Sequence, residues 1–227
     1  MTLENLKIIT IDGPASSGKS TVAQIVSKSL GFQHLNTGSI YRALALLCLE
    51  ENTKLTQKEE IKKHCDTIKK DYHQSLDSRR FFIGKRDITT EIKTPEISEL
   101  TSKLSELPLV RKELLDIQRN FARKHNGVIV DGRDMGTVVF PNAPLKIFLT
   151  ALPEKRAQRR LLELEAKNIS CSLEDLIKEI KSRDARDEKR TLSPLKASHD
   201  AIIIDSSERS AKQVAHNIIK HAKHMLN

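Results

Sequence analysis

The sequence predicts an α/β protein in which a parallel β-sheet is flanked by helices and carries a phosphate-binding loop of the P-loop NTPase type. Strands and helices alternate along most of the 227 residues, a pattern typical of parallel sheets covered on both faces. The motif Gly-x-x-x-x-Gly-Lys-Ser, residues 13–20, lies between an apolar strand and an amphipathic helix. Residues 71–92 change to short strand-like segments separated by turns, which predicts a small antiparallel insertion.

The first elements follow from periodicity and stop signals. Residues 7–12 are a β-branched run typical of a buried strand. Residues 20–30 place apolar side chains at helical spacing, and Gly31 provides a stop. A second short strand over 32–36 leads into an apolar helix over 39–49.

The insertion is recognised by its change of texture. Residues 54–70 are rich in Lys and Glu and are helical at most. Turn residues at 77–78 and 84–85 separate three strand-like segments, which are residues 72–76, 80–83 and 87–88. A helix over 95–104 begins at a proline, which loses no hydrogen bond in a first turn.

The second half of the chain returns to alternation. Pro108 is expected to begin a helix, and Ser172 with Asp175 forms a plausible capping box for a later one. The elements expected here are helices over 108–125, 154–167, 173–186 and 210–226 and strands over 127–132, 145–149 and 201–205.

Composition bounds the class of protein and of ligand. Hydrophobic content of 38%, charged content of 30% and the lack of any membrane-length apolar run indicate a globular protein. The net charge of +9 suits a polyanionic ligand, whereas 4% aromatic residues and no Trp argue against a single-stranded nucleic-acid platform. Residues 1–6 lack the regions of a secretion signal, and three scattered cysteines show no metal spacing. We therefore expect a cytoplasmic protein with reduced thiols.

The phosphate loop has a specific chemistry. Its small residues allow consecutive backbone N–H groups to surround a polyphosphate, and the following helix directs its positive end at the anion. Lys19 can reach the β- and γ-phosphates, and the Ser20 hydroxyl can hold Mg²⁺. The flanking strand and helix argue against a chance glycine-rich turn. The nucleotide-binding residues predicted here are Gly13, Pro14, Ala15, Ser16, Ser17, Gly18, Lys19, Ser20 and Thr21.

Charged residues at the end of the strand over 127–132 are further candidates. Asp131 can orient Mg²⁺ or its waters, although a solvated carboxylate at a strand end is the alternative. Arg133 can hold a phosphate through two parallel N–H bonds, and Asp134 can accept from an amino group on a base. An ion pair between these two neighbours is the alternative.

Other arginines also suit phosphate binding. Arg42 and Thr37 could face an anion near a helix start, or the Arg42 stem could simply cover apolar surface. Two arginine-bearing helices flank a turn at 168–172 and could form a mobile lid, although mixed charges are usually a solvated helix face. The lid arginines are Arg156, Arg159, Arg160, Arg183, Arg186 and Arg190. The eight histidines show no catalytic pairing or zinc spacing.

Four runs of residues match a known pattern. They are Ile11-Asp12-Gly13-Pro14, Thr37-Gly38-Ser39-Ile40-Tyr41-Arg42, the run Asp131-Gly132-Arg133-Asp134-Met135-Gly136-Thr137 continuing to Pro141, and Arg183-Asp184-Ala185-Arg186-Asp187. In these motifs the chain resembles the bacterial cytidylate kinases, which phosphorylate CMP and dCMP, and the resemblance extends from Ile8 to the last helix. One departure is Asn36, where the family more often has Asp, and it leaves a local hydrogen bond open.

The resemblance implies one kinase domain over residues 1–227, made of a core, an NMP-binding insertion and a helical lid. The approximate bounds are 1–60, 105–155 and 195–227 for the core, 62–104 for the insertion and 156–192 for the lid. It also implies that the CMP phosphate is held by Thr37, Arg42, Arg133 and Arg190. Cytosine would be read by Ser102, Arg111 and Asp134. The sugar or phosphate would meet Arg183 and Asp187, and the ATP side of the lid would carry Arg156, Arg159 and Arg186.

The expected activity is ATP-dependent phosphorylation of CMP and dCMP with ATP as donor and Mg²⁺ as cofactor. The metal would be held by Ser20 and, through water, by Asp131, and the catalytic residues would be Lys19, Asp131, Arg133 and Arg186. Kinases of UMP, AMP or shikimate are rivals on the same fold, and a nucleotide-switched nucleic-acid-binding protein is a rival of another class. We expect a monomer that binds no membrane and no nucleic acid stably.

Overall fold

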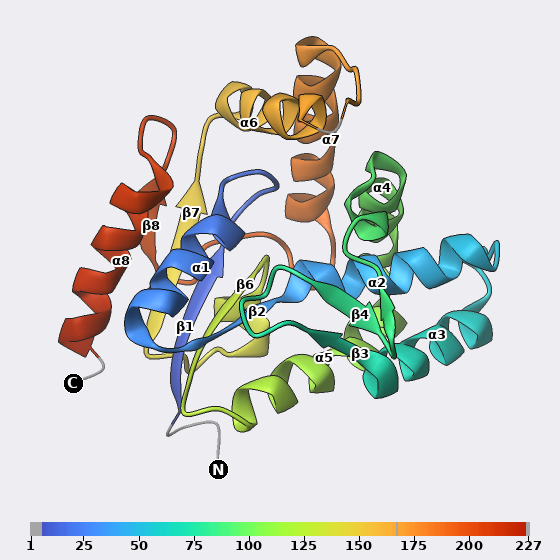
Figure 1. The fold of residues 1–227 in the computed structure, drawn as a ribbon, viewed down its shortest axis with the longest axis horizontal. Helices are drawn as coiled ribbons and strands as arrows, with labels where there is room; N and C mark the ends of the chain where they lie inside the picture. The colour runs from blue at the N-terminus through green and yellow to red at the C-terminus, as the bar shows by residue number, and fades with distance from the viewer. Residues whose placement is uncertain (1–5, 167, 226–227) are drawn as a thin grey trace.

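The computed structural model describes residues 6–166 and 168–225 and confirms the predicted fold class (Figure 1). Its central sheet has five parallel strands in the order β2-β6-β1-β7-β8. The strands are β1 (Lys7–Asp12), β2 (Gln33–Asn36), β6 (Gly127–Gly132), β7 (Leu145–Thr150) and β8 (Ile202–Asp205). The order places β1, which leads into the phosphate loop, in the middle of the sheet, where its backbone is paired on both sides.

Eight α-helices occur among the described residues, each close to a predicted range. They are α1 (Lys19–Leu30), α2 (Thr37–Glu50), α3 (Lys58–Asp71), α4 (Pro95–Leu104), α5 (Pro108–Arg123), α6 (Pro153–Glu165), α7 (Leu173–Lys189) and α8 (Ala211–Met225). The Gly31 stop is confirmed, since this glycine caps α1 in the left-handed conformation with φ 68°. The predicted helix ends at Lys167 and Leu226, and the first five residues of the predicted core, lie outside the described residues.

The antiparallel insertion is also present, with its first two strands shorter than predicted and its third strand displaced by one residue. It consists of β3 (Tyr72–Gln74), β4 (Phe81–Ile83) and β5 (Arg86–Asp87). The prediction that Ser75 and Leu76 extend the first strand is wrong, because the backbone carbonyl of Ser75 accepts from the N–H of Ser78 at 2.8 Å and starts the turn. Residues 54–70 are more regular than predicted, since most of this stretch forms the helix α3.

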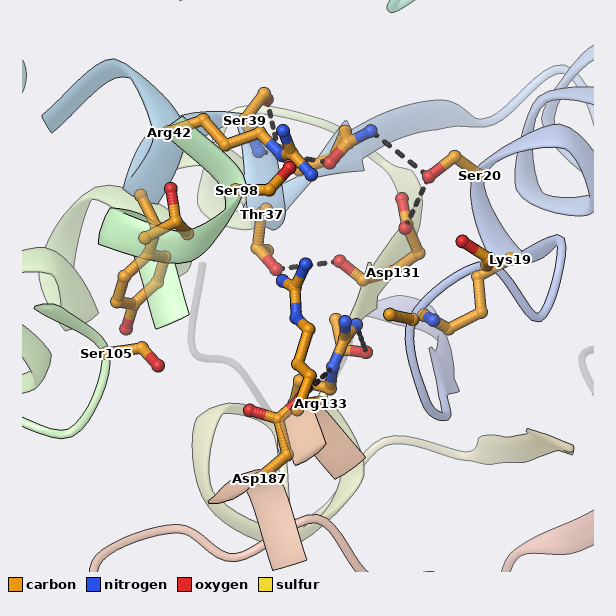
Figure 2. A pocket seen from close by; sticks show the side chains of 18 of the residues that line it. Lys19, Ser20, Thr37, Ser39, Arg42, Ser98, Ser105, Asp131, Arg133 and Asp187 are labelled. Carbon is orange, nitrogen blue, oxygen red and sulfur yellow. Dashed lines mark hydrogen bonds and ion pairs between the residues drawn. The ribbon is translucent and has the colours of Figure 1, made fainter. Parts of the chain in front are cut away.

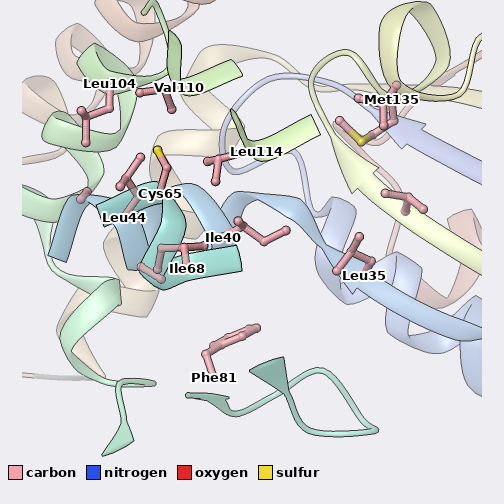
Figure 3. Packing of buried hydrophobic residues seen from close by; sticks show 14 of the residues in the cluster. Leu35, Ile40, Leu44, Cys65, Ile68, Phe81, Leu104, Val110, Leu114 and Met135 are labelled. Carbon is pink, nitrogen blue, oxygen red and sulfur yellow. The ribbon is translucent and has the colours of Figure 1, made fainter. Parts of the chain in front are cut away.

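The two faces of the sheet bury separate cores, as the alternation of side chains along β1 and β6 requires. Ile9, Ile11 and Ile129 face α1 and α8, where they pack with Val22 and Ile218. The strand residues that face the other way are Ile8, Leu35, Val128 and Val130, and they pack against α2, α3 and α5. These helices contribute Ile40, Leu44, Cys65, Ile68 and Leu114 to the same cluster (Figure 3). This second core continues without a break into the insertion.

Helices α6 and α7 form a third unit above the edge of the sheet where the parallel strands end (Figure 1). They bury a small cluster of their own, made of Ala157, Leu164, Leu176 and Ile180. Ser172 begins α7 and accepts from the backbone N–H of Asp175 at 3.0 Å, which confirms the cap predicted there. These two helices make up most of residues 156–192, the segment predicted to form the lid.

The glycine that begins the phosphate loop is required by its surroundings. Gly13 has φ 149°, and a Cβ on it would overlap the carbonyl oxygen of Leu149 in β7. We expect Gly13→Ala to lower the free energy of unfolding by about 3 kcal/mol or more, because a rigid backbone atom must shift. Thermal or urea unfolding measures the change.

Gly31→Ala is the matched control. Gly31 also has positive φ, at 68°, but no described atom outside its chain neighbours lies within 4 Å of the place that a methyl group would take. The change should cost about 1 kcal/mol through backbone strain alone. Equal losses in the two variants would contradict the proposed overlap with β7.

Candidate active site

A cavity of about 640 Å³ opens at the carboxyl edge of the central sheet, between the phosphate loop, α2, α4 and the lid (Figure 2). This is the edge at which ligands bind in open α/β sheets, and the volume suits a nucleotide-sized ligand. The predicted site residues that line it are Ala15, Ser16, Gly18, Lys19, Ser20, Thr21, Thr37, Arg42, Arg111, Asp131, Arg133, Asp134, Arg183, Asp187 and Arg190.

The phosphate loop connects β1 to α1 as predicted. Gly18, with φ 90°, caps α1, so the first N–H groups of the helix point into the loop. The Lys19 ammonium lies over this loop and donates to the carbonyl oxygen of Pro14 at 2.6 Å and to Ser17 Oγ at 3.3 Å. Burial, followed by the positive charge of Arg133, lowers the pKa of Lys19 below its usual value. An anion bound in the loop would offset both effects, because a nearby negative charge favours the charged ammonium.

Asp131 is not a solvated carboxylate at a strand end, because only 4% of its surface is exposed and both oxygens are hydrogen-bonded. Oδ2 accepts from Ser20 Oγ at 2.8 Å, and Oδ1 lies 2.6 Å from His34 Nε2. Its backbone carbonyl accepts from Thr37 Oγ1 at 2.7 Å (Figure 2). A hydroxyl and a carboxylate oxygen are therefore adjacent, and these are the ligand types that Mg²⁺ prefers.

The structure shows which hydrogen bonds Asn36 makes in the place where the family more often has Asp. Its Oδ1 accepts from the backbone N–H of Ser39 at 3.1 Å and caps α2, which explains why this helix starts two residues before the predicted range. Its Nδ2 donates to Ser20 Oγ at 3.1 Å. The amide thus takes both a capping and a donor role, and a carboxylate could take only the first.

Six arginines of the described residues line the cavity, and they come from α2, α5, α6, α7 and the end of β6. Arg42 lines it from α2 and donates to the carbonyl of Ile92 at 2.8 Å, so its role is more than covering apolar surface. Burial first, and then the charges of Arg183, Arg160 and Arg133, lowers the pKa of Arg42 to about 9. Burial and Arg133 likewise lower the pKa of Arg183 to about 10. So many close positive charges favour a ligand with at least two negative charges.

Asp187 holds the lid to the strand end. Its Oδ2 accepts from Arg133 Nε at 2.9 Å (Figure 2). Its Oδ1 lies 3.6 Å from Arg190 Nη1. The alternative of an ion pair between Arg133 and its neighbour Asp134 is therefore not what the structure shows. Asp134 instead pairs with Arg111 of α5, which also donates to the carbonyl of Ser105 at 3.2 Å.

Several predicted residues do not line the cavity. Ser102 is 2% exposed and its Oγ has no hydrogen-bond partner among the described residues, whereas Ser98, Thr101 and Ser105 of the same segment do line the cavity. Since α4 turns by about 100° per residue, Ser102 points elsewhere. The remaining predicted residues outside the lining are Gly13, Pro14, Ser17, Arg156, Arg159 and Arg186.

Some lid arginines bond to other parts of the protein, and others line the cavity. Arg156 is 3% exposed and is used by the protein itself, donating to Asp184 at 3.0 Å, to the carbonyl of Ala15 at 3.2 Å and to another carbonyl. Arg159 donates to the carbonyl of Ser17 at 3.4 Å. Arg160, one position further on, is the residue that lines the cavity. The sequence shows the arginines but not which of them faces inward.

Asp12, at the end of β1, clamps the segment that carries the strand-end charges. Its two carboxylate oxygens accept the backbone N–H groups of Met135 at 2.8 Å and Gly136 at 2.7 Å. These residues start a π-helical turn, Met135–Val139, which periodicity did not predict. Burial raises the pKa of Asp12 from 3.8 to about 7, against the lowering effect of these two N–H groups.

The clamp gives a stability prediction with a definite sign. Between about pH 4 and pH 7 the folded protein keeps the Asp12 proton that the unfolded chain has released, so stability falls as pH rises through this window. Asp12→Asn removes this dependence. The free energy of unfolding of Asp12→Asn minus that of wild type should therefore rise with pH by up to about 1.4 kcal/mol per pH unit. The difference should level off above pH 7. Urea unfolding at several pH values measures the difference, and a constant difference would contradict the assignment.

Comparison with known proteins gives a consistent result. A family model described as "Cytidylate kinase" matches residues 9–224. A cytidylate kinase of Pseudomonas syringae pv. tomato is 44% identical over 215 residues, covering 93% of this chain and 93% of that protein. One of Thermotoga neapolitana is 43% identical over 213 residues, covering 93% and 94%. A solved structure of an uncharacterized protein from Eubacterium ventriosum shares the fold with TM-score 0.52 and 14% identity, covering 97% and 99%.

These matches span the central sheet, the insertion and the lid, and they include the phosphate loop and the strand-end motif of residues 131–137. No helix in the described parts of the chain is long and apolar enough to cross a membrane. The resemblance inferred from the motifs is thus confirmed, and the chain belongs to the cytidylate kinase family.

Proposed function

We propose that the protein transfers the γ-phosphoryl group of ATP to CMP and dCMP, giving ADP and CDP or dCDP. The observation that carries the proposal is that two anion-binding groups share one cavity. The phosphate loop with Lys19 lines one side, and Arg42, Arg133 and Arg183 line the other. A phosphotransferase whose acceptor is itself a phosphate needs both groups, because donor and acceptor are both anions.

The residues next to the loop fit a magnesium ion. Ser20 and Asp131 present a hydroxyl and a carboxylate oxygen that lie 2.8 Å apart. Among the described residues there is no cluster of three His, Cys, Asp or Glu side chains suited to a metal. Two protein oxygens suit a magnesium ion whose other ligands come from bound phosphates and water. The ion would neutralise charge on the β- and γ-phosphate oxygens.

Transfer requires positioning more than acid–base chemistry. A phosphate oxygen of CMP, already anionic near neutral pH, forms the new bond to the γ-phosphorus while the bond to the β–γ bridging oxygen breaks and ADP leaves. Lys19 and the loop N–H groups stabilise the charge that develops on the donor side. Arg42, Arg133 and Arg183 hold the acceptor in line, which avoids the entropic cost of an encounter in water.

Base selection is assigned to Asp134 and Arg111. Asp134 is 5% exposed, lines the cavity and is oriented by the Arg111 guanidinium. A carboxylate can accept from the exocyclic amino group of cytosine, which uracil lacks. Ser102 remains a prediction, and the neighbouring hydroxyls of Thr101 and Ser105 offer alternatives from the same segment.

Closure of the lid is the remaining part of the proposal. The core would comprise about residues 1–60, 105–155 and 195–227, the insertion 62–104 and the lid 156–192. The contact of Asp187 with Arg133 joins the lid to the core over the cavity, and Arg190 flanks Asp187 within the lid. Such closure excludes water, which would otherwise accept the phosphoryl group. Arg159 and Arg186 are proposed to act on the donor side, and the working unit is proposed to be a cytoplasmic monomer.

The test is formation of ADP from ATP and magnesium with a panel of acceptors. CMP and dCMP should be phosphorylated, with UMP, AMP and shikimate slower by at least about 100-fold in kcat/KM, as expected when a hydrogen-bonding site meets the wrong partner. CDP should be identified directly as the product. Turnover of UMP, AMP or shikimate in preference to CMP, or RNA binding without turnover of CMP, would replace the proposal with the corresponding rival.

A further inference from the structure

We propose that His34 is a positioning residue, which fixes the Asp131 carboxylate so that this carboxylate and Ser20 are preset for the phosphate-bound cation. The inference rests on the proposed function, because it concerns the same cation site. The observation behind it is a fully buried imidazole, 1% exposed, whose Nε2 lies 2.6 Å from Asp131 Oδ1. The motifs and spacings of the sequence did not single out this histidine.

The pairing of β2 with β6 brings the His34 side chain next to the Asp131 carboxylate. Strand β2 pairs in parallel with β6, and its register sets Asn36 opposite Asp131. His34 lies two residues before Asn36, so both side chains leave β2 on the same face of the sheet. From that face His34 reaches Asp131 Oδ1, and Asn36 reaches Ser20 Oγ at 3.1 Å. One short strand therefore contacts both members of the cation-binding pair.

The position of His34 is itself held from outside the central sheet. Its backbone carbonyl accepts hydrogen bonds from Ser78 Oγ at 2.7 Å and from Gln74 Nε2, both in the insertion. Ser78 is 1% exposed, so this attachment is protected from water. Neither the backbone nor the ring of His34 can shift without breaking a buried hydrogen bond.

The hydrogen-bond directions define the role. A carboxylate accepts only, so Nε2 must donate to Asp131, while Nδ1 has no partner among the described residues. The two Asp131 oxygens are therefore held by different elements, Oδ1 by β2 and Oδ2 by Ser20 of α1. With a cation bound, the Ser20 hydroxyl would turn to it, and Asp131 Oδ2 would be free to accept from a water on that cation. His34 keeps Oδ1 in place throughout.

A histidine used only for packing would behave differently. The ring would then be replaceable by an apolar ring of similar volume at no cost to cation affinity. A partner that orients a metal-binding carboxylate instead typically contributes 10- to 100-fold in metal affinity, as an approximate range. Two variants separate packing from orientation of Asp131. His34→Phe keeps a ring but has no N–H donor, and His34→Gln keeps an N–H donor but has no ring.

The experiment measures Mn²⁺ binding to the full-length protein saturated with a non-hydrolysable ATP analogue, by electron paramagnetic resonance and without CMP. His34→Phe, which removes the donor, should weaken Mn²⁺ binding by about 10- to 100-fold. His34→Gln, which restores an N–H donor, should recover most of the affinity. His64→Phe is the control, because His64 is also buried, at 5% exposed, but its ring bonds Thr53, and neither residue lines the cavity.

Kinetics supply a second readout in the same variants. With CMP as acceptor, His34→Phe should lower kcat by a similar factor and raise the magnesium concentration needed for half-maximal rate, with KM for CMP unchanged. A folded His34→Phe protein that binds Mn²⁺ as wild type does would overturn the proposal. If the wild-type protein made no CDP but His34→Phe still weakened Mn²⁺ binding, the proposed role of His34 would stand and CMP would be rejected as the acceptor.

Wild-type protein provides a test that does not depend on the variants folding. Nitrogen-15 NMR of the histidine rings, with the His34 signal assigned, should show Nε2 protonated with and without the magnesium–nucleotide analogue. A His34 ring without a proton on Nε2 in both states could not donate to Asp131, and the proposal would fail.

Discussion

Replacing Lys19 with methionine is expected to lower kcat by about 10³-fold or more, the largest effect of any single change in this protein. Of the two lysines that line the cavity among the described residues, Lys19 is the one whose ammonium bonds the phosphate loop, whereas Lys93 belongs to the insertion. Methionine keeps most of the length and volume of the side chain but removes the charge that stabilises the transferring phosphoryl group. Steady-state kinetics with ATP and CMP measure the loss.

The loss should lie mainly in kcat, because the loop N–H groups still bind the donor phosphates. Lys28→Met is the matched control, since Lys28 is exposed at the other end of α1 and should leave kcat within about twofold. Retention of wild-type turnover by Lys19→Met would remove the basis for the phosphate-loop mechanism.

The second large effect is expected at Asp134. Asp134→Asn should lower kcat/KM for CMP by about 100-fold, because an amide that keeps its bond to Arg111 meets the amino group of cytosine with a weaker acceptor or with a donor. The value for UMP should change by less than about tenfold or increase, since an amide can donate to the uracil carbonyl. The measured quantity is therefore the ratio of the two specificity constants.

Asp116→Asn supplies the control, because Asp116 is an exposed carboxylate on α5, the same helix that carries Arg111. It alters the net charge of the protein equally without touching the cavity. If Asp134→Asn left the ratio of CMP to UMP unchanged, the assignment of Asp134 to base recognition would be wrong, although the phosphate-transfer mechanism would stand.

The motifs with fixed backbone geometry were predictable from the sequence. Gly13 and Gly18 adopt positive φ, and Gly31 ends α1, so these positions tolerate few alternatives and stand out as glycines. Asp131 was also predictable, because the polar end of an apolar parallel strand falls at the ligand-binding edge of the sheet. Each of these features depends on a short stretch of consecutive residues, so the sequence alone reveals it.

Side-chain direction on the lid was not predictable. Arg156, Arg159 and Arg160 are all expected on one arginine-rich helix, yet Arg156 bonds Asp184 and the phosphate-loop backbone while Arg160 lines the cavity. The choice depends on how α6 packs on α7, through contacts such as the pair Arg156–Asp184, 28 positions apart. Ser102 differs from Thr101 and Ser105 for the same reason, since the rotation of α4 against α2 decides which hydroxyls face the cavity.

Contacts across the sheet were equally hidden. His34 and Asp131 are 97 residues apart, and Asp12 is 123 residues from the backbone N–H of Met135 that it binds. No local pattern marks such pairs, because pairing of β2 and β1 with β6 creates them. The sequence by itself determined the α/β class, the phosphate loop and the family of this chain, since these depend on short-range spacing. The tertiary structure alone decided which charges meet in the cavity, because strand order and helix rotation set those distances.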